Sequence, residues 1–155
     1  MGMILKTEKV IKEYTDYNGH LNVAFYVRIF DIAADIMLDN FNMGARSVKK
    51  DQKTTFVAEM HTIYKQEVRL GEEVETHLTY LNHDKKRIQY RLSMFHKEKK
   101  YLADTNEILS LYVDLSKRKV VEFDSDRLKI MDDFIKKNSQ KFNVENLIFS
   151  DKLKK

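Results

Sequence analysis

The longest run of regular hydrophobic spacing begins at Val23 and ends at Phe41. Apolar side chains recur there at i, i+3, i+4 and i+7, the pattern of a helix with one broad buried face. They are Val23, Tyr26, Val27, Phe30, Ala33, Ala34, Met37, Leu38 and Phe41. The charged side chains on the opposite face are Arg28, Asp31, Asp35 and Asp39. The sequence therefore predicts one long amphipathic helix whose apolar face needs a cover.

Alternating apolar and polar positions predict strands on both sides of this helix. A first strand is expected within residues 3–14, and four longer strands are expected at 54–68, 74–80, 88–94 and 101–113. Short polar turns such as 82–85 and 97–100 separate the later strands, so we predict that the four form an antiparallel meander. Residues 42–53 are expected to be a connection. A short strand at 120–123 and a helix capped by Asp124 or Ser125 should follow.

This order of elements predicts an α+β fold in which a curved antiparallel sheet wraps a long central helix, with an extra C-terminal helix. The 155 residues include four glycines and no proline, which predicts one domain over residues 1–138 without a flexible linker. The tail at 139–155 is rich in Lys and Asn but contains Leu147, Ile148 and Phe149, which are suited to docking on a surface. Pairing two sheets about a two-fold axis would cover a sheet edge, so we expect a homodimer or homotetramer.

The amino-acid composition restricts the kinds of functional site that we expect in this protein. The sequence has no cysteine, which excludes disulfides and thiolate chemistry, and its five histidines lack the paired spacing of a metal site. We therefore expect neither a metal nor a redox cofactor. No stretch of 18 apolar residues and no secretory signal occurs, so we expect a cytoplasmic protein without a membrane partner. The net charge of +4 is modest for a nucleic-acid binder, and the Lys clusters at 85–87 and 97–100 are interpreted as solvated turn charges, the alternative being contacts to phosphates.

The polar loop before the long helix carries the strongest candidate for chemistry. Asn22 occupies the N-cap position, and Gly19 allows the loop to turn. The start of a helix presents unpaired N–H groups and partial positive charge, which can hold an anion or a carbonyl oxygen that is becoming one. We expect the loop to place Asp16 and His20 beside the N-terminal end of the helix. A carboxylate beside such a site is an arrangement for acyl transfer, although an aspartate in a polar loop, taken alone, is more often a turn residue.

For the other polar candidates, the sequence allows both a functional and a purely structural role. His20 either orients Asp16 or the substrate, or bonds to backbone. Glu59 and His61 share a strand face and form either a second acid/base or substrate-binding pair, or a polar pair at a subunit interface or in solvent. The tyrosines are either core side chains with satisfied hydroxyls or, together with Glu59, a cage for a cationic acyl group; they are Tyr17, Tyr26 and Tyr64.

The motif Asp16-x-x-Gly19-His20-x-Asn22-x-x-x-Tyr26 resembles the signature of hotdog-fold acyl-CoA thioesterases of the 4-hydroxybenzoyl-CoA thioesterase type. The resemblance covers roughly residues 5–115. Within that class, residues 16–26, 56–61 with Tyr64, and 67–72 are most similar to the betainyl-CoA thioesterases associated with carnitine breakdown.

The resemblance implies hydrolysis of a small acyl-CoA thioester, with betainyl-CoA as one candidate. It assigns Asp16 as nucleophile or general base and the Val23 N–H as the group that polarises the carbonyl, with Asn22 holding that end of the helix. Many relatives carry an acidic residue two positions before the catalytic one and a second Asn after the first, where this chain has Tyr14 and Val23. The alternatives are a non-catalytic acyl-CoA-binding protein of the same fold and, last, a basic nucleic-acid module.

Overall fold

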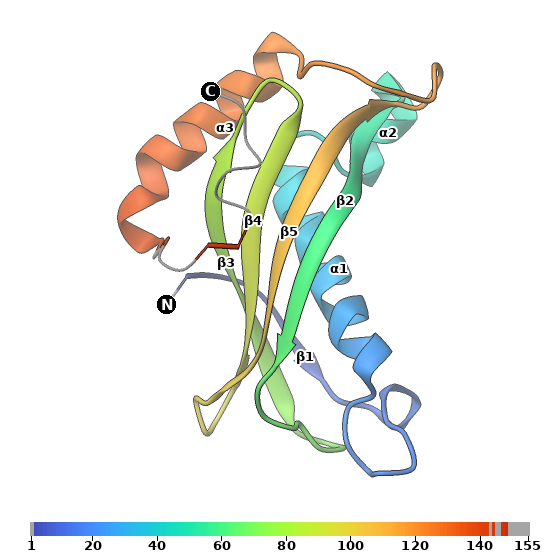
Figure 1. Ribbon diagram of the computed structural model, residues 1–155, viewed down its shortest axis with the longest axis vertical. Helices are drawn as coiled ribbons and strands as arrows, with labels where there is room; N and C mark the ends of the chain where they lie inside the picture. Colours follow the sequence, from blue (N-terminus) through green and yellow to red (C-terminus); the bar gives the residue numbers. More distant parts are fainter. Residues whose placement is uncertain (1, 143, 145–146, 149–155) are drawn as a thin grey trace.

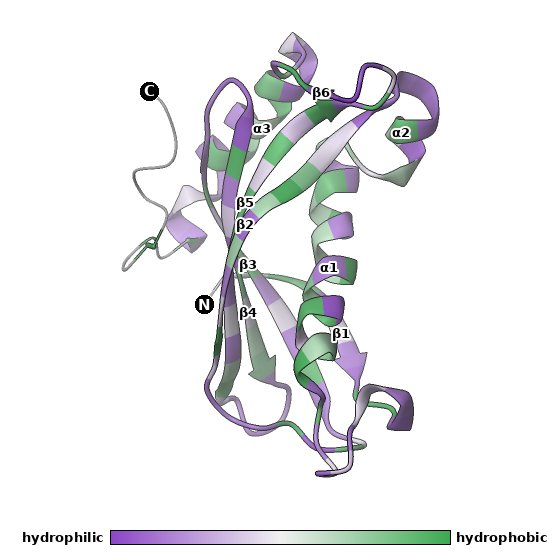
Figure 2. Ribbon diagram, turned by 45° about the vertical axis from the view of Figure 1, so that its right-hand side comes forward, coloured by the Kyte–Doolittle hydropathy of each residue, from purple (hydrophilic) through white to green (hydrophobic). Residues whose placement is uncertain are grey.

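The computed structural model, which describes residues 2–142, 144, 147 and 148, contains one antiparallel sheet with a long helix against one face (Figures 1 and 2). The strands are β1 (Met3–Lys9), β2 (Lys53–Tyr64), β3 (Glu73–His83), β4 (Arg87–His96), β5 (Leu102–Asp114) and β6 (Lys119–Val120). Their order is β1-β3-β4-β5-β2, and the short β6 pairs with β5. The α+β arrangement of a curved antiparallel sheet around a long helix, with a further helix near the C-terminus, is confirmed.

The prediction that four successive strands form a meander is wrong for the first of them, β2. Strands β3, β4 and β5 follow one another across the sheet, but β2 lies at the far edge, beside β5. Residues 65–72 connect β2 to β3 and are too long for a tight hairpin turn. The connection is held by backbone hydrogen bonds at the ends of other elements, since Leu21 N donates to Val68 O at 2.7 Å and Val10 N donates to Glu72 O at 2.9 Å. It therefore crosses the end of the sheet and passes the start of the long helix.

The predicted long helix is confirmed as α1 (Val23–Asn40). Its buried face consists of Tyr26, Ile29, Phe30, Ala33, Ala34 and Met37, and Phe41 follows it into the core. Figure 2 shows α1 lying along one face of the sheet. Val23 departs from the predicted stripe because it is 57% exposed at the very start of the helix. That end of α1 is consequently open to solvent.

Two further helices cover one end of the sheet (Figure 1). The short helix α2 (Ala45–Asp51) lies where the sequence predicted only a connection, because two turns of mostly polar residues show no hydrophobic period. The predicted C-terminal helix is confirmed as α3 (Ser125–Asn138), with Asp124 at its N-cap position. Phe134 of α3 packs edge-on against Phe41 and Tyr80 at ring-centroid distances of 5.0 and 5.7 Å. Short 3₁₀ turns occupy Lys12–Tyr14 and Ser139–Lys141.

Ile148, one of the described residues of the C-terminal tail, contacts the sheet face opposite α1. The Ile148 N–H donates to the Glu107 carboxylate at 3.0 and 2.9 Å. Glu107 alternates along β5 with Asn106, whose side chain lines a cavity beside α1, so the two point to opposite faces. Of the expected apolar trio in the tail, Phe149 lies outside the described residues. None of the helices in the described part of the chain is long and apolar enough to cross a membrane.

The outer edge of β2 has no partner strand among the described residues. There, β2 pairs with β5 alone, over eleven register positions from Lys53 to Tyr64. Several large apolar side chains along this strand are between 40 and 48% exposed: Phe56, Val57, Met60, Ile63 and Tyr64. A long edge strand with exposed apolar side chains is a surface that proteins normally cover.

Candidate active site

The loop before α1 is a tight turn that directs Asp16 back toward the helix. Gly19 N donates to Asp16 O at 3.0 Å, and the Asn18 N–H donates to the Asp16 carboxylate at 2.8 Å. Gly19 has φ of +74°, a left-handed conformation that costs a side-chain-bearing residue free energy. The predicted role of Gly19 in turning the loop is confirmed.

Asn22 joins this loop to the first turn of α1. Its side-chain oxygen accepts a hydrogen bond from the Ala24 N–H at 3.0 Å, and its amide nitrogen donates to the other Asp16 carboxylate oxygen at 3.4 Å. Within the described part of the chain, the Val23 N–H has no acceptor. The structure thus places a carboxylate beside a helix start whose first N–H is available to a ligand.

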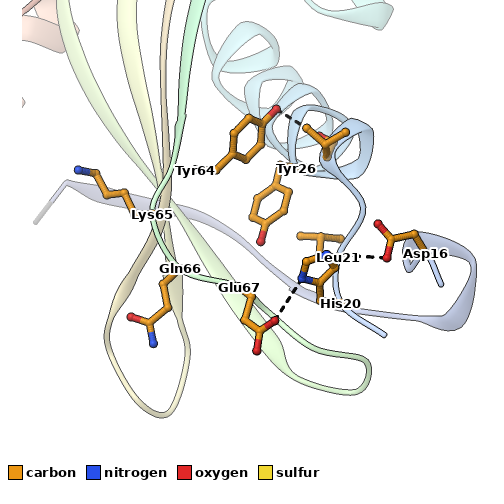
Figure 3. Close-up of a pocket in the computed structure, with 9 residues that line it drawn as sticks. Asp16, His20, Leu21, Tyr26, Tyr64, Lys65, Gln66 and Glu67 are labelled. Carbon is orange, nitrogen blue, oxygen red and sulfur yellow. Dashed lines mark hydrogen bonds and ion pairs between the residues drawn. The ribbon is translucent and has the colours of Figure 1, made fainter. Parts of the chain in front are cut away.

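His20 lies between two carboxylates. Its Nε2 is 3.8 Å from Asp16 Oδ1, and its Nδ1 is 3.2 Å from Glu67 Oε2 (Figure 3). Arg69 holds Glu67 in turn, with Nε donating at 2.8 Å and a second guanidinium nitrogen at 2.7 Å from the same carboxylate oxygen. Hydrogen bonds from Arg69 and then from His20 lower the pKa of Glu67. The carboxylate therefore stays ionised and fixes the ring of His20 beside Asp16.

These groups line a cavity of about 310 Å³ between the start of α1 and the end of β2. Its lining, shown in Figure 3, consists of Asp16, His20, Leu21, Val23, Tyr26, Tyr64, Lys65, Gln66 and Glu67. The rings of Tyr26 and Tyr64 meet edge to face at 5.3 Å, and the Tyr64 hydroxyl donates to Val23 O at 3.4 Å. Burial raises the pKa of Tyr26 to about 12. Both phenols accordingly stay neutral and form an aromatic wall.

Most of the residues predicted from the sequence meet at this cavity. Asp16, His20, Val23, Tyr26 and Tyr64 line it, and Asn22 contacts Asp16 from the helix start.

Three of the predicted substrate-binding residues are placed elsewhere in this chain. Tyr17 is 98% exposed at the tip of the loop. Glu59 and His61 alternate along β2 with the residues that face α1, so they point to the opposite side of the sheet from Tyr64. Their roles remain predictions.

Glu67 was not identified from the sequence as part of the site. It belongs to the connection after β2, which carries no helical or strand periodicity. The one available signal was its place in residues 67–72, a stretch that resembles thioesterases. What brings it to the loop is an isolated bridge between His20 and Arg69, far apart in sequence. Among the described residues, no group of three or more His, Asp or Glu side chains is arranged to hold a metal ion.

Comparison with protein families finds one match over most of the chain. The model of the thioesterase-like superfamily matches residues 10–136. Among characterised proteins, the betainyl-CoA thioesterase of Pseudomonas aeruginosa is 28% identical over 130 residues, which cover 83% of this chain and 82% of that protein.

Solved structures share the fold. A Staphylococcus aureus protein determined in complex with CoA superimposes with a TM-score of 0.83 at 22% identity, covering 95% of this chain and 90% of that one. The DHNA-CoA thioesterase of Staphylococcus aureus has a TM-score of 0.79 at 17% identity, with coverage of 92% and 96%. At these identities the likeness establishes the shared architecture.

Proposed function

Because the chain belongs to the thioesterase-like superfamily and is a thioester hydrolase, we propose that it cleaves a small acyl-CoA thioester at the cavity beside the start of α1. The observation that carries this proposal is the hydrogen bond of 3.4 Å from the Asn22 amide to Asp16. The same side chain caps the helix, so one residue sets the position of the carboxylate relative to the Val23 N–H. A nucleophile or base and an oxyanion donor are the two parts that acyl transfer needs.

Two routes use these parts. In the first, the Asp16 carboxylate attacks the thioester carbonyl, CoA leaves as the thiolate, and water hydrolyses the resulting anhydride. In the second, Asp16 removes a proton from a water that attacks the same carbon; the C–S bond then breaks, and the proton goes to the departing CoA thiolate. In both, negative charge develops on the carbonyl oxygen, which the Val23 N–H and the positive end of α1 stabilise. Such a donor is worth about a hundredfold to a thousandfold in rate.

The His20 and Glu67 pair supports Asp16 in either route. The Glu67 carboxylate accepts a hydrogen bond from Nδ1 of His20, which leaves Nε2 directed at Asp16. We assign His20 the role of holding Asp16 and the incoming water in place.

The betainyl group is our candidate for the acyl moiety, on the basis of the Pseudomonas aeruginosa relative. Its quaternary ammonium carries a permanent positive charge without hydrogen-bond donors. The aromatic wall formed by Tyr26 and Tyr64 suits such a group, because ring faces attract cations.

The open edge of β2 favours a homodimer. Pairing with the same edge of a second chain would satisfy its free backbone groups and cover its exposed apolar side chains. A two-fold axis makes this surface complementary to itself.

Replacing Asp16 with Asn tests the proposal. The amide keeps an acceptor for the Asn18 N–H but is neither a nucleophile nor a base. The rate of CoA release, followed with a thiol reagent, should fall by roughly 10² to 10⁴, while the protein still folds, as a cooperative melting transition would show. Asp133→Asn on the exposed side of α3 is the matched control and should leave the rate intact.

Two outcomes would contradict the proposal. Unchanged turnover in Asp16→Asn would remove Asp16 from the mechanism. Tight binding of acyl-CoA by the native protein without CoA release would support the non-catalytic alternative.

A further inference from the structure

A carboxyl group lies buried behind the aromatic wall of the cavity. Asp104 is fully buried on β5, and its register partners are Tyr64 on β2 and Met94 on β4. Residues paired across antiparallel strands point to the same face, with their Cβ atoms about 5 Å apart. Because Tyr64 contacts Tyr26 of α1, this is the face that the helix covers. The Asp104 side chain therefore lies beside Tyr64, between the sheet and the helix.

Asp104 lacks the partners that a buried acid normally has. Neither of its carboxyl oxygens makes a hydrogen bond within the described part of the chain. Two residues further along the same face, the Asn106 side-chain oxygen is also buried without a partner, at a second cavity of about 290 Å³ between α1 and β2. Buried polar groups in native proteins are nearly always hydrogen-bonded, and leaving one unsatisfied destabilises the fold. Two such groups together indicate a site for a ligand.

Packing and charge around Asp104 restrict what that ligand is. Tyr26 and Tyr64 face it from α1 and β2, and Met94 faces it from β4. The positive charge of Lys65 lowers the pKa of Asp104, but Figure 3 shows the Lys65 side chain directed away from the two tyrosines. Aromatic rings with an acid behind them attract a cation, and they do so without hydrogen-bond geometry. The other two carboxylates at the cavity, Asp16 and Glu67, are already held by donors.

We propose that Asp104, with the rings of Tyr26 and Tyr64, is the subsite that selects an acyl group bearing a quaternary ammonium. The cation rests against the rings, and the carboxylate behind them supplies the opposite charge in a desolvated setting. This inference rests on the proposed thioesterase function and adds the residue that determines its specificity.

The protonation of Asp104 is consistent with this role. Burial raises its pKa to about 8, while Lys65 lowers it. In the free protein near neutral pH the group is mostly the uncharged acid, which limits the cost of burying it. Arrival of a cation favours the ionised form, and the proton leaves to solvent.

Two substrates of the same shape test the proposal. Trimethylammonioacetyl-CoA (betainyl-CoA) and 3,3-dimethylbutanoyl-CoA differ in the charge of one atom. The native protein should show a kcat/KM at least about tenfold higher for the cationic ester. Asp104→Asn should lower the ratio of the two kcat/KM values by roughly a hundredfold, because a buried charge loses its partner. Glu107→Gln, on the same strand but the opposite face, is the matched control and should leave the ratio unchanged.

The outcomes separate this inference from the function it rests on. An unchanged ratio in Asp104→Asn, or an equal fall on both esters, would overturn the subsite. A native protein that prefers the neutral ester would overturn it too, while leaving the thioesterase function intact. A native protein inactive on both esters and on every other acyl-CoA would overturn the proposed function itself.

A second measurement needs no variant, in case Asp104→Asn does not fold. The ratio of the two kcat/KM values in the native protein should rise between about pH 6 and pH 9 as Asp104 loses its proton. Groups that serve both esters, such as Asp16 and His20, cancel in the ratio. Tyr26 and Tyr64 do not contribute in this range, because burial raises the pKa of both above the ordinary 10.0. A ratio that stays constant with pH would contradict the assignment.

Discussion

The Asn22 side chain makes two contacts that substitutions can separate. Its oxygen caps α1 by accepting from the Ala24 N–H, and its nitrogen donates to Asp16. Serine is as good an N-cap as asparagine, but its single hydroxyl is shorter and is used up by the cap. Asn22→Ser should therefore keep the helix end and lose the contact to Asp16. Asn22→Ala should lose both.

The expected magnitudes differ between stability and rate. Loss of an N-cap costs about 1 kcal/mol, which lowers the melting temperature of a domain of this size by roughly 2–4 °C. A hydrogen bond to a charged group is worth about 1.5–3 kcal/mol, and at 3.4 Å the contact to Asp16 belongs at the lower end. Loss of about 1.4 kcal/mol corresponds to a tenfold fall in rate.

Calorimetric melting and kcat/KM for CoA release measure the two effects. Both variants should be about tenfold slower than the native protein, and Asn22→Ala should melt roughly 2–4 °C below Asn22→Ser, because only the serine keeps the cap. If Asn22→Ser keeps full activity while Asn22→Ala loses it, the cap alone matters and the contact to Asp16 plays no part in catalysis.

Two further predictions concern acid stability and assembly. Burial raises the pKa of Glu72, but hydrogen bonds from Lys99 and from the Arg69 N–H outweigh burial and lower this pKa from the ordinary 4.5 to about 2. The stabilisation by ionised Glu72 is therefore complete above pH 4.5 and is lost as the pH falls toward 2. Near pH 7 the native protein should melt at a higher temperature than Glu72→Gln, and this difference should shrink below pH 4.5. A difference that does not change with pH would contradict the prediction. Val57→Lys on the open edge of β2 should convert a dimer into a monomer in light scattering, and a native protein that is already monomeric would end the dimer proposal.

The sequence by itself determined the parts of the site that depend on near neighbours. The spacing of apolar residues defined α1 almost to its ends, because side chains three and four positions apart share a helix face. Gly19 and Asn22 predicted the turn and the cap, since each acts within a few residues of itself. Asp16 could be placed beside the helix start for the same reason.

Tertiary structure decided everything that depends on which distant segments become neighbours. Alternation along β2 predicted a strand, but its position beside β5 follows from the path of residues 65–72 and from no local pattern. The same path brings Glu67 to His20, across 47 positions of sequence. The burial of Asp104 without a hydrogen-bond partner among the described residues likewise exists only once β2, β4 and α1 pack around it. Periodicity reports which side of an element a residue occupies, whereas the groups that meet it there are set by the packing of the whole chain.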